Sequence, residues 1–506
     1  MVISVDIHVY SCVPMKWEER GFEMVGITSY GACIPWYRIS RKTIYSAMGW
    51  LNPATFLPGE KAVANWDEDS ITMAVNASVD CLNEVDRNII DGVYFGSVTL
   101  PYKERLNAGI IATVLDLRPD IKSADFAGST KAGTAALLSA CDAVKAGSAK
   151  SIMVCASDCR IGKAGSSQEE AYGDGAAAFL LSDSNVVASL EGFYSISYDF
   201  MDHWRGEYDR FDRTWEDRWA REEGYAKFIP EAIQGLAKKY DLKLKDFAKV
   251  VYPCLYTRVH AGIAKKLGLG PDQIQPHMFD TVGNTGTAYP LMMFVAALED
   301  AKPGDKILVV SFGNGSDALF FEVTDQIENI KDKRRGVKGH LNLKQELDSY
   351  EKYAAFRNII PIERGIRGEE VFSTQISMLW RDRRMVLALH GSKCKRCGTP
   401  QYPPQRVCVN PDCGAIDEME DYRFSDKKGR LFTYTGDSLA FSPNPPALYG
   451  VVDFEGGGRY WFDITDCDLD SLKVGMPVEM SFRRRYLDET RGISGYFWKA
   501  VPIRVE

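Results

Sequence analysis

The sequence lacks the long apolar run that a membrane-spanning helix needs. No stretch of its 506 residues approaches 18 consecutive apolar side chains, and about 18 to 20 are needed to cross a bilayer. The first residues, MVISVDIHVYSC, contain no basic segment, and Asp6 interrupts their apolar run. They do not resemble a signal peptide, so we expect a cytoplasmic protein with no membrane partner.

Cysteines are also few, and the negative charges outnumber the positive ones. The 12 cysteines are too few for a disulfide scaffold in a chain of this length, which favours a reducing compartment. Lys and Arg number 61 against 69 Asp and Glu, giving a net charge of −8. This balance argues against a nucleic-acid partner, although it leaves room for a local basic pocket that binds a phosphorylated ligand.

The apolar content is sufficient for a folded protein of several domains. Hydrophobic residues make up 45% of the chain, enough to bury a core. At roughly 150 residues per domain, the length predicts two to four domains.

Strand and helix patterns alternate between residues 24 and 324. The patterns typical of strands lie at residues 92–95, 151–156 and 306–311, and those typical of helices at 70–85, 131–146 and 289–298. This alternation predicts a layered α/β domain. Residues 173–182 and 313–323 each place a Gly-rich turn before an apolar strand, which indicates an internal duplication.

The rest of the chain changes character twice. Residues 325–384 are polar and helical, and we interpret them as a connecting arm that is either a solvated spacer or an interface. A cysteine cluster follows in residues 385–420. Residues 421–506 then contain five short strand patterns, at 430–435, 448–454, 459–464, 477–482 and 494–501. Short strands separated by Gly, Pro and Asp turns predict a small β-barrel, an OB-fold being the first choice.

The cysteine cluster has the spacing of a metal site. Cys394, Cys397, Cys408 and Cys413 form the pattern C-x2-C-x10-C-x4-C. Each pair can present two thiolates to one ion, and four sulfurs close a tetrahedral Zn²⁺ site with no open position. We therefore predict a structural zinc ribbon, because such a small domain gains much of its stability from the metal.

Many motifs in residues 24–324 resemble hydroxymethylglutaryl-CoA synthase, particularly its archaeal branch. The matching stretches are residues 59–82, 130–138 (TKAGTAALL), 198–205 (YDFMDHWR), 264–268 (AKKLG), 283–286 (GNTG) and 311–316 (SFGNGS). The resemblance implies the thiolase fold, in which two similar αβ halves surround buried helices, usually in a dimer.

The C-terminal part resembles the zinc-ribbon and OB-fold module that accompanies thiolase-type acyl-CoA enzymes. The resemblance lies in residues 380–397, 402–408 and 472–482. Residues 1–23 match neither family pattern and form an N-terminal extension.

The resemblance also implies a Claisen-type condensation on thioesters, for which the family uses a cysteine, a glutamate and a histidine. The cysteine position, directly before K-A-G-T, holds Thr130 here, the glutamate position holds Val98, and the histidine position holds Pro253. A threonine hydroxyl needs an adjacent base to attack, and neither valine nor proline transfers protons. We therefore expect no catalytic residue of the family type.

Other positions keep a possible role. If the register were locally different, Ser129, Cys254 or His260 could substitute for a lost group. The resemblance implies that Asn284, Arg258 and Lys131 bind substrate. His203, by contrast, lies in a family motif that we interpret as packing.

Two hypotheses follow for the function. In the first, the chain is a non-catalytic subunit that binds a CoA thioester and pairs, as a homodimer or hetero-oligomer, with a separate catalytic thiolase-type subunit. In the second, it is an enzyme without a cysteine nucleophile, performing a retro-aldol or Claisen-type reaction on 3-hydroxyacyl- or 3-oxoacyl-CoA with Tyr256, His260 or Asp202 as base. Ordinary synthase activity would require a different register at all three catalytic positions.

Overall fold

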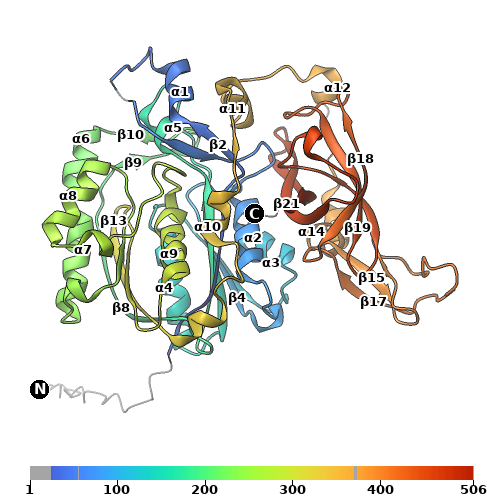
Figure 1. The fold of residues 1–506 in the computed structure, drawn as a ribbon, viewed down its shortest axis with the longest axis horizontal. Helices are drawn as coiled ribbons and strands as arrows, with labels where there is room; N and C mark the ends of the chain where they lie inside the picture. The colour runs from blue at the N-terminus through green and yellow to red at the C-terminus, as the bar shows by residue number, and fades with distance from the viewer. Residues whose placement is uncertain (1–23, 55, 370–372, 505–506) are drawn as a thin grey trace, which may run out of the picture.

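One mixed sheet runs through the larger part of the molecule (Figure 1). The computed structural model describes residues 24–54, 56–369 and 373–504, so the predicted extension of residues 1–23 lies outside the described residues. The strands of the sheet are β1 (Gly26–Cys33), β4 (Gly92–Gly96), β5 (Lys122–Phe126), β6 (Ser151–Asp158), β7 (Gly175–Ser182), β8 (Ala188–Ser197), β11 (Lys249–Val251), β12 (Lys306–Val310) and β13 (Gly315–Val323). Their order is β11-β12-β13-β8-β1-β7-β6-β4-β5.

The two halves of this sheet repeat one topology. In the first half β4 is parallel to β6, and antiparallel β7 and β1 follow. In the second half β11 is parallel to β12, and antiparallel β13 and β8 follow. Strands β7 and β13 contain the two Gly-rich segments that look alike in the sequence, so the predicted duplication is confirmed.

Helices cover the sheet, and two of them lie in the core. The helices of this part are α1 (Arg41–Met48), α2 (Ser70–Cys81), α3 (Asn107–Val114), α4 (Ala132–Lys145), α5 (Ser167–Ala171), α6 (Asp217–Trp219), α7 (Ala226–Lys239), α8 (Thr257–Leu267) and α9 (Tyr289–Asp300). Side chains of α4 and α9 belong to one buried cluster. Helix α9 is apolar on nearly all sides, as expected for a helix with no solvent face.

Helix α2 ends before its predicted limit. The sequence pattern extends to Val85, but the helix stops at Cys81. The chain then turns through Glu84, whose φ of 61° is left-handed and therefore incompatible with a continuing helix.

The connecting arm packs partly against the α/β domain. It contains α10 (Gly336–Asn342), β14 (Gln345–Glu346), α11 (Tyr350–Phe356), α12 (Gly365–Glu369), α13 (Ile376–Arg381) and α14 (Arg383–Leu387). Strand β14 pairs with β2 (Tyr37–Ser40), which in turn pairs with β3 (Glu60–Val63). Tyr353 and Phe356 share a buried cluster with Tyr37, so this stretch of the arm packs against the α/β domain.

Two small β-structures form the C-terminal module, drawn in orange and red in Figure 1. The first sheet contains β15 (His390–Cys394), β16 (Pro400–Gln401) and β17 (Met419–Arg423). The second contains β18 (Gly429–Asp437), β19 (Ala447–Phe454), β20 (Arg459–Asp463), β21 (Pro477–Asp488) and β22 (Ile493–Pro502), in the order β20-β19-β18-β21-β22. A bridge between Ile464 and Ala500 joins its two edges and closes the barrel.

A buried group of charges joins this barrel to the N-terminal end of α2. This interdomain charge cluster consists of Asp67, Glu68, Asp466, Arg483 and Lys499. Arg483 lies 2.7 Å from Glu68 and 3.4 Å from Asp67, and it also pairs with Asp466. Lys499 lies 3.0 Å from Asp67. Because all five side chains are buried, removing one charge would leave others without compensation.

Candidate functional site

A cavity of about 560 Å³ opens beside the N-terminal end of α4. Its wall includes Thr130 before α4, Pro253 after β11 and Asn284 before α9. The approach of α4 to the sheet is close, because a Cβ on Gly96 would lie only 2.9 Å from Cα of Gly133. The fold thus brings together two of the three predicted catalytic positions, Thr130 and Pro253, and one predicted binding residue, Asn284.

The Thr130 hydroxyl is held by the backbone. It donates a hydrogen bond of 2.7 Å to the Phe312 carbonyl, and Thr130 is only 8% exposed. The neighbouring Ser129 hydroxyl donates to the Gly313 carbonyl at 2.8 Å. Among the described residues, no titratable side chain accepts either proton, so neither hydroxyl has the adjacent base that a nucleophile requires.

Val98, at the third position predicted from the family, lies in a loop fixed by a buried carboxylate. Asp158 Oδ1 accepts hydrogen bonds from the Val98 amide at 2.8 Å and the Ser97 hydroxyl at 2.9 Å. Its Oδ2 accepts from the Thr287 amide at 2.7 Å. Burial raises the pKa of Asp158, but these donors occupy both oxygens, which makes the side chain a structural anchor.

The substitutes predicted near Pro253 do not reach the cavity. Cys254 is fully buried, and burial raises the pKa of its thiol to about 12. His260 stacks on Tyr252 with 4.1 Å between ring centroids, and burial lowers its pKa to about 4. Within the described part of the chain, neither of these side chains nor Ser129 lines the cavity.

The three predicted substrate-binding residues lie in different surroundings. Asn284 lines the cavity, and its Oδ1 accepts the Gly286 amide at 3.0 Å. Lys131 turns away from the cavity and contacts Ser197 at 3.0 Å and Asp317 at 3.3 Å. Arg258 is exposed on α8. Only Asn284 is therefore placed to touch a ligand in this cavity.

Sequence reasoning interpreted His203 as packing, but His203 and Asp202 both line the cavity. His203 Nδ1 lies 2.8 Å from Asp202 Oδ2. The histidine starts β9 (His203–Trp204), which pairs with β10 (Arg213–Thr214). The adjacent Asp-His letters were the only signal in the sequence, and they do not tell which cavity the pair faces.

An arginine missed by the sequence analysis anchors this wall. Arg160 lines the cavity and donates to Asp212 and to the Tyr172 hydroxyl, both at 2.7 Å. Burial lowers the pKa of Arg160, but its interactions with Tyr172 and Asp212 outweigh burial, so the pKa lies above its ordinary value. Because Asp212 directly precedes β10, this contact fixes the β9–β10 hairpin to the sheet.

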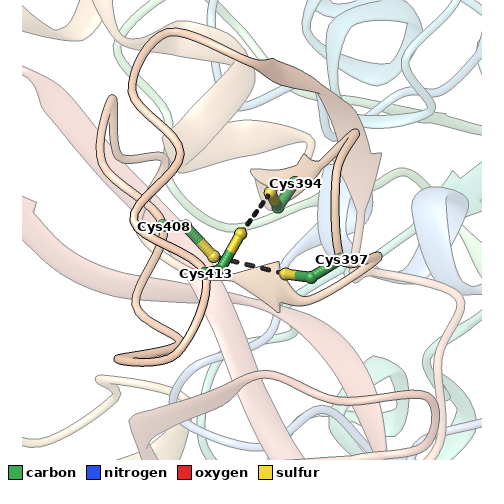
Figure 2. A group of neighbouring side chains, drawn as sticks. All are labelled: Cys394, Cys397, Cys408 and Cys413. Carbon is green, nitrogen blue, oxygen red and sulfur yellow. Dashed lines mark hydrogen bonds between the residues drawn. The ribbon is translucent and has the colours of Figure 1, made fainter.

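The second candidate site is the cysteine cluster (Figure 2). The four sulfurs of Cys394, Cys397, Cys408 and Cys413 lie within 4.8 Å of one another. Cys394 and Cys413 are 3.7 Å apart, and Cys397 and Cys408 are 3.4 Å apart. A tetrahedral ion with Zn–S distances of about 2.3 Å requires sulfurs about 3.8 Å apart. The donor set therefore fits Zn²⁺ in number, chemistry and spacing.

Three parts of the chain match known protein families. Residues 382–417 match the family described as "ChsH2, rubredoxin-like zinc ribbon domain", and residues 422–483 match "ChsH2, C-terminal OB-fold domain". Residues 237–319 match "3-Oxoacyl-[acyl-carrier-protein (ACP)] synthase III C terminal". The predicted zinc ribbon and OB-fold are confirmed.

Whole-protein comparisons agree on the larger domain. The chain is 36% identical to hydroxymethylglutaryl-CoA synthase of Methanopyrus kandleri over 321 residues, covering 62% of this chain and 91% of that protein. It is 34% identical to the enzyme of Thermococcus onnurineus over 340 residues, covering 66% and 96%.

Solved structures confirm the thiolase fold. An HMG-CoA synthase crystallised with CoA superposes with a TM-score of 0.60 at 19% identity, covering 70% of this chain and 95% of that one. A 3-oxoacyl-(acyl carrier protein) synthase III from Pseudomonas aeruginosa gives a TM-score of 0.53 at 18% identity, covering 60% and 98%. No described helix has the length and hydropathy needed to cross a bilayer.

Proposed function

The chain belongs to the hydroxymethylglutaryl-CoA synthase family, and we propose that it binds an acyl-CoA in a complex that makes or breaks a carbon–carbon bond next to the thioester. The cavity at α4 is the proposed acyl site. It is large enough for a short acyl group and the thioester end of the ligand, with Asn284 as a polar contact.

The state of Thr130 is the observation that carries this proposal. An acyl-enzyme needs a nucleophile with a base beside it. The Thr130 hydroxyl instead donates to a main-chain carbonyl, Val98 cannot accept a proton, and Pro253 offers neither a side-chain donor nor an amide hydrogen. The chain is therefore a non-catalytic subunit for the family's acyl transfer.

The C-terminal module has a supporting role in this proposal. Zn²⁺ bound by the four cysteines supplies a structural cross-link, because four sulfurs leave no position open for a substrate. This module matches the ChsH2 zinc-ribbon and OB-fold families and resembles the module that accompanies thiolase-type acyl-CoA enzymes. The resemblance supports an assembly of this chain with such an enzyme. The catalytic nucleophile then belongs to a separate thiolase-type subunit.

Two measurements on the full chain test the proposal. Calorimetric titration with acetyl-CoA should detect binding, and Ala171→Trp should abolish it, because Ala171 lines the cavity. Ala261→Trp places the same side chain at an exposed site on α8 and should bind normally. Intact-mass analysis after incubation should show no acetyl addition. A stable acetyl adduct on one residue, or equal binding by both tryptophan variants, would contradict the proposal.

A second candidate function is an enzyme that acts without a covalent intermediate. The observation in its favour is the hydrogen-bonded Asp202–His203 pair on the cavity wall. A retro-aldol cleavage needs a base and groups that stabilise an oxyanion, but no nucleophile. Turnover of 3-hydroxyacyl-CoA by the full chain distinguishes this function from binding alone.

A further inference from the structure

We infer that Asp202 and His203 form the acid–base pair of the cavity, with His203 as the catalytic residue and Asp202 as its positioning residue. The inference rests on the second candidate function and assigns the residues that perform it. Its substrate class is a CoA thioester with a hydroxyl on the third acyl carbon.

The geometry of the pair suits proton transfer. Asp202 Oδ2 lies 2.8 Å from His203 Nδ1, so the carboxylate fixes the ring orientation and stabilises the imidazolium when the ring takes a proton. Both side chains are largely buried, at 10% and 15% exposure. Among the described residues, nothing hydrogen-bonds His203 Nε2, which leaves this nitrogen available to a ligand.

Asp202 provides a second, independent observation. Its Oδ1 is buried and has no hydrogen-bond partner within the described chain. A buried carboxylate oxygen without a donor is unfavourable. Asp202 thus lines the cavity with a carboxylate whose pairing in the protein is incomplete, and the His203 ring is its one hydrogen-bond partner among the described residues.

The hairpin that carries the pair is held from several sides. Arg160 donates to Asp212 at 2.7 Å, and the Arg205 guanidinium donates to the Val98 carbonyl. In Figure 1, β9 and β10 lie near α5, whose residues Ser167 and Gln168 also line the cavity. A catalytic group needs such support to keep its geometry.

Other titratable groups on the wall are less suited to the role. Tyr256 lines the cavity, but burial raises the pKa of its phenol, which keeps it protonated. Asp217 also lines the cavity, yet it pairs with Arg221 at 2.9 Å. His260 does not reach the cavity. Of the groups compared, the Asp202–His203 pair is therefore the acid–base candidate whose ring nitrogen has no hydrogen-bond partner among the described residues.

The proposed step balances without a co-reactant. His203 Nε2 takes the proton of the 3-hydroxyl, and the O–H electrons form the new C3=O bond. The C2–C3 bond breaks, and its electron pair stays on C2 as the thioester enolate. The imidazolium then returns the proton to C2. The products are a shortened acyl-CoA and an aldehyde or ketone.

The test uses the purified full chain with 3-hydroxybutanoyl-CoA and 3-hydroxy-3-methylglutaryl-CoA as substrates. Released acetyl-CoA is measured by mass spectrometry, and binding of butanoyl-CoA is measured separately. We expect turnover of at least one substrate. His203→Gln should lower the rate by about 10² to 10⁴-fold while still binding butanoyl-CoA. His277→Gln, a half-buried histidine off the cavity, is the matched control.

Asp202→Asn checks the positioning role. It preserves the shape of the side chain but removes the charge that favours the imidazolium, so the acidic limb of the pH–rate profile should move to lower pH. A merely structural residue would change the rate without moving that limb.

Each result has one meaning. Butanoyl-CoA binding without cleavage of either substrate overturns the inference and leaves the binding function standing. Cleavage that survives His203→Gln also overturns it. Absence of any CoA-thioester binding contradicts the proposed function itself, and the inference fails with it.

Discussion

The cysteine cluster and the cavity at α4 differ in whether their polar side chains have partners within the protein. In the cluster, four thiols converge within 4.8 Å of one another, and an ion can satisfy them all. In the cavity, the side chains at the predicted catalytic positions are either apolar, as Pro253 is, or hydrogen-bonded to the main chain, as Thr130 is to the Phe312 carbonyl. Donor groups that converge without partners in the protein thus indicate a ligand site. Groups that are hydrogen-bonded to the main chain instead hold the fold together.

The Asp202–His203 pair is the exception within the cavity. It lines the same cavity as Thr130 and Asn284, yet Asp202 Oδ1 has no hydrogen-bond partner in the part of the chain that the structure describes. Because one of its polar atoms has no partner in the described chain, this pair resembles the cysteine cluster more than it resembles its neighbours in the cavity.

Loss of a cluster thiol should have the largest effect. Cys394→Ser removes a buried ligand from a four-sulfur site, and structural zinc contributes on the order of 10 kcal/mol in small zinc domains. Zinc content, measured by elemental mass spectrometry, should fall from one ion per chain to nearly none, and the module should lose its cooperative thermal transition. Cys141→Ser changes another buried cysteine, in α4, and should keep the metal. Full zinc content in Cys394→Ser would refute the assignment.

The interdomain charge cluster, which joins the C-terminal barrel to the α/β domain, should be the next most sensitive point. Arg483→Met leaves the buried Asp67, Glu68 and Asp466 without the arginine that pairs with all three, and breaking such a buried pair costs about 3 to 5 kcal/mol. Denaturant unfolding should then split into two transitions, one for the α/β domain and one for the C-terminal module.

Arg459 supplies the control for this joint. Its pair with Asp453 is about half exposed, so Arg459→Met should cost at most about 1 kcal/mol. A single transition with an unchanged midpoint in Arg483→Met would show that the charge cluster does not couple the α/β domain to the C-terminal module.

Glu68 should make the stability of the same joint depend on pH. Three carboxylates face two cations there, and burial raises the pKa of Glu68 to about 8. The folded state then holds a proton that the unfolded chain releases near its ordinary pKa of 4.5, so stability should fall as pH rises from about 5 to 8. The slope should reach at most about 1.4 kcal/mol per pH unit.

Glu68→Gln provides the matched measurement. The amide cannot ionise, so the free energy of unfolding, measured in urea across this pH range, should become flatter. An equally steep decline in Glu68→Gln would assign the pH dependence to another group.

The sequence predicted those features that depend on local pattern. The zinc ribbon came from four cysteines within twenty residues, and the strands and helices from their periodicity. The charge cluster could not be predicted, because Asp67 and Arg483 are 416 residues apart. The place of His203 on the cavity wall could not be predicted for a similar reason, since only the folded hairpin brings it there. The roles of Thr130, Val98, Pro253 and Asn284 stay predictions.

The smallest expected effect tests whether the Thr130 hydroxyl is structural. Thr130→Val keeps the shape of the side chain but removes the 2.7 Å hydrogen bond to the Phe312 carbonyl, which should cost about 1 kcal/mol of unfolding free energy. Acetyl-CoA affinity and any cleavage activity should change less than twofold, because the hydroxyl faces the main chain. Thr113→Val, which removes the 2.9 Å bond to Gly109 within α3, is a control of similar chemistry away from the cavity. If Thr130→Val abolished activity while keeping its stability, the hydroxyl would belong with the groups that indicate a ligand site, and the contrast between the two regions would fail at this residue.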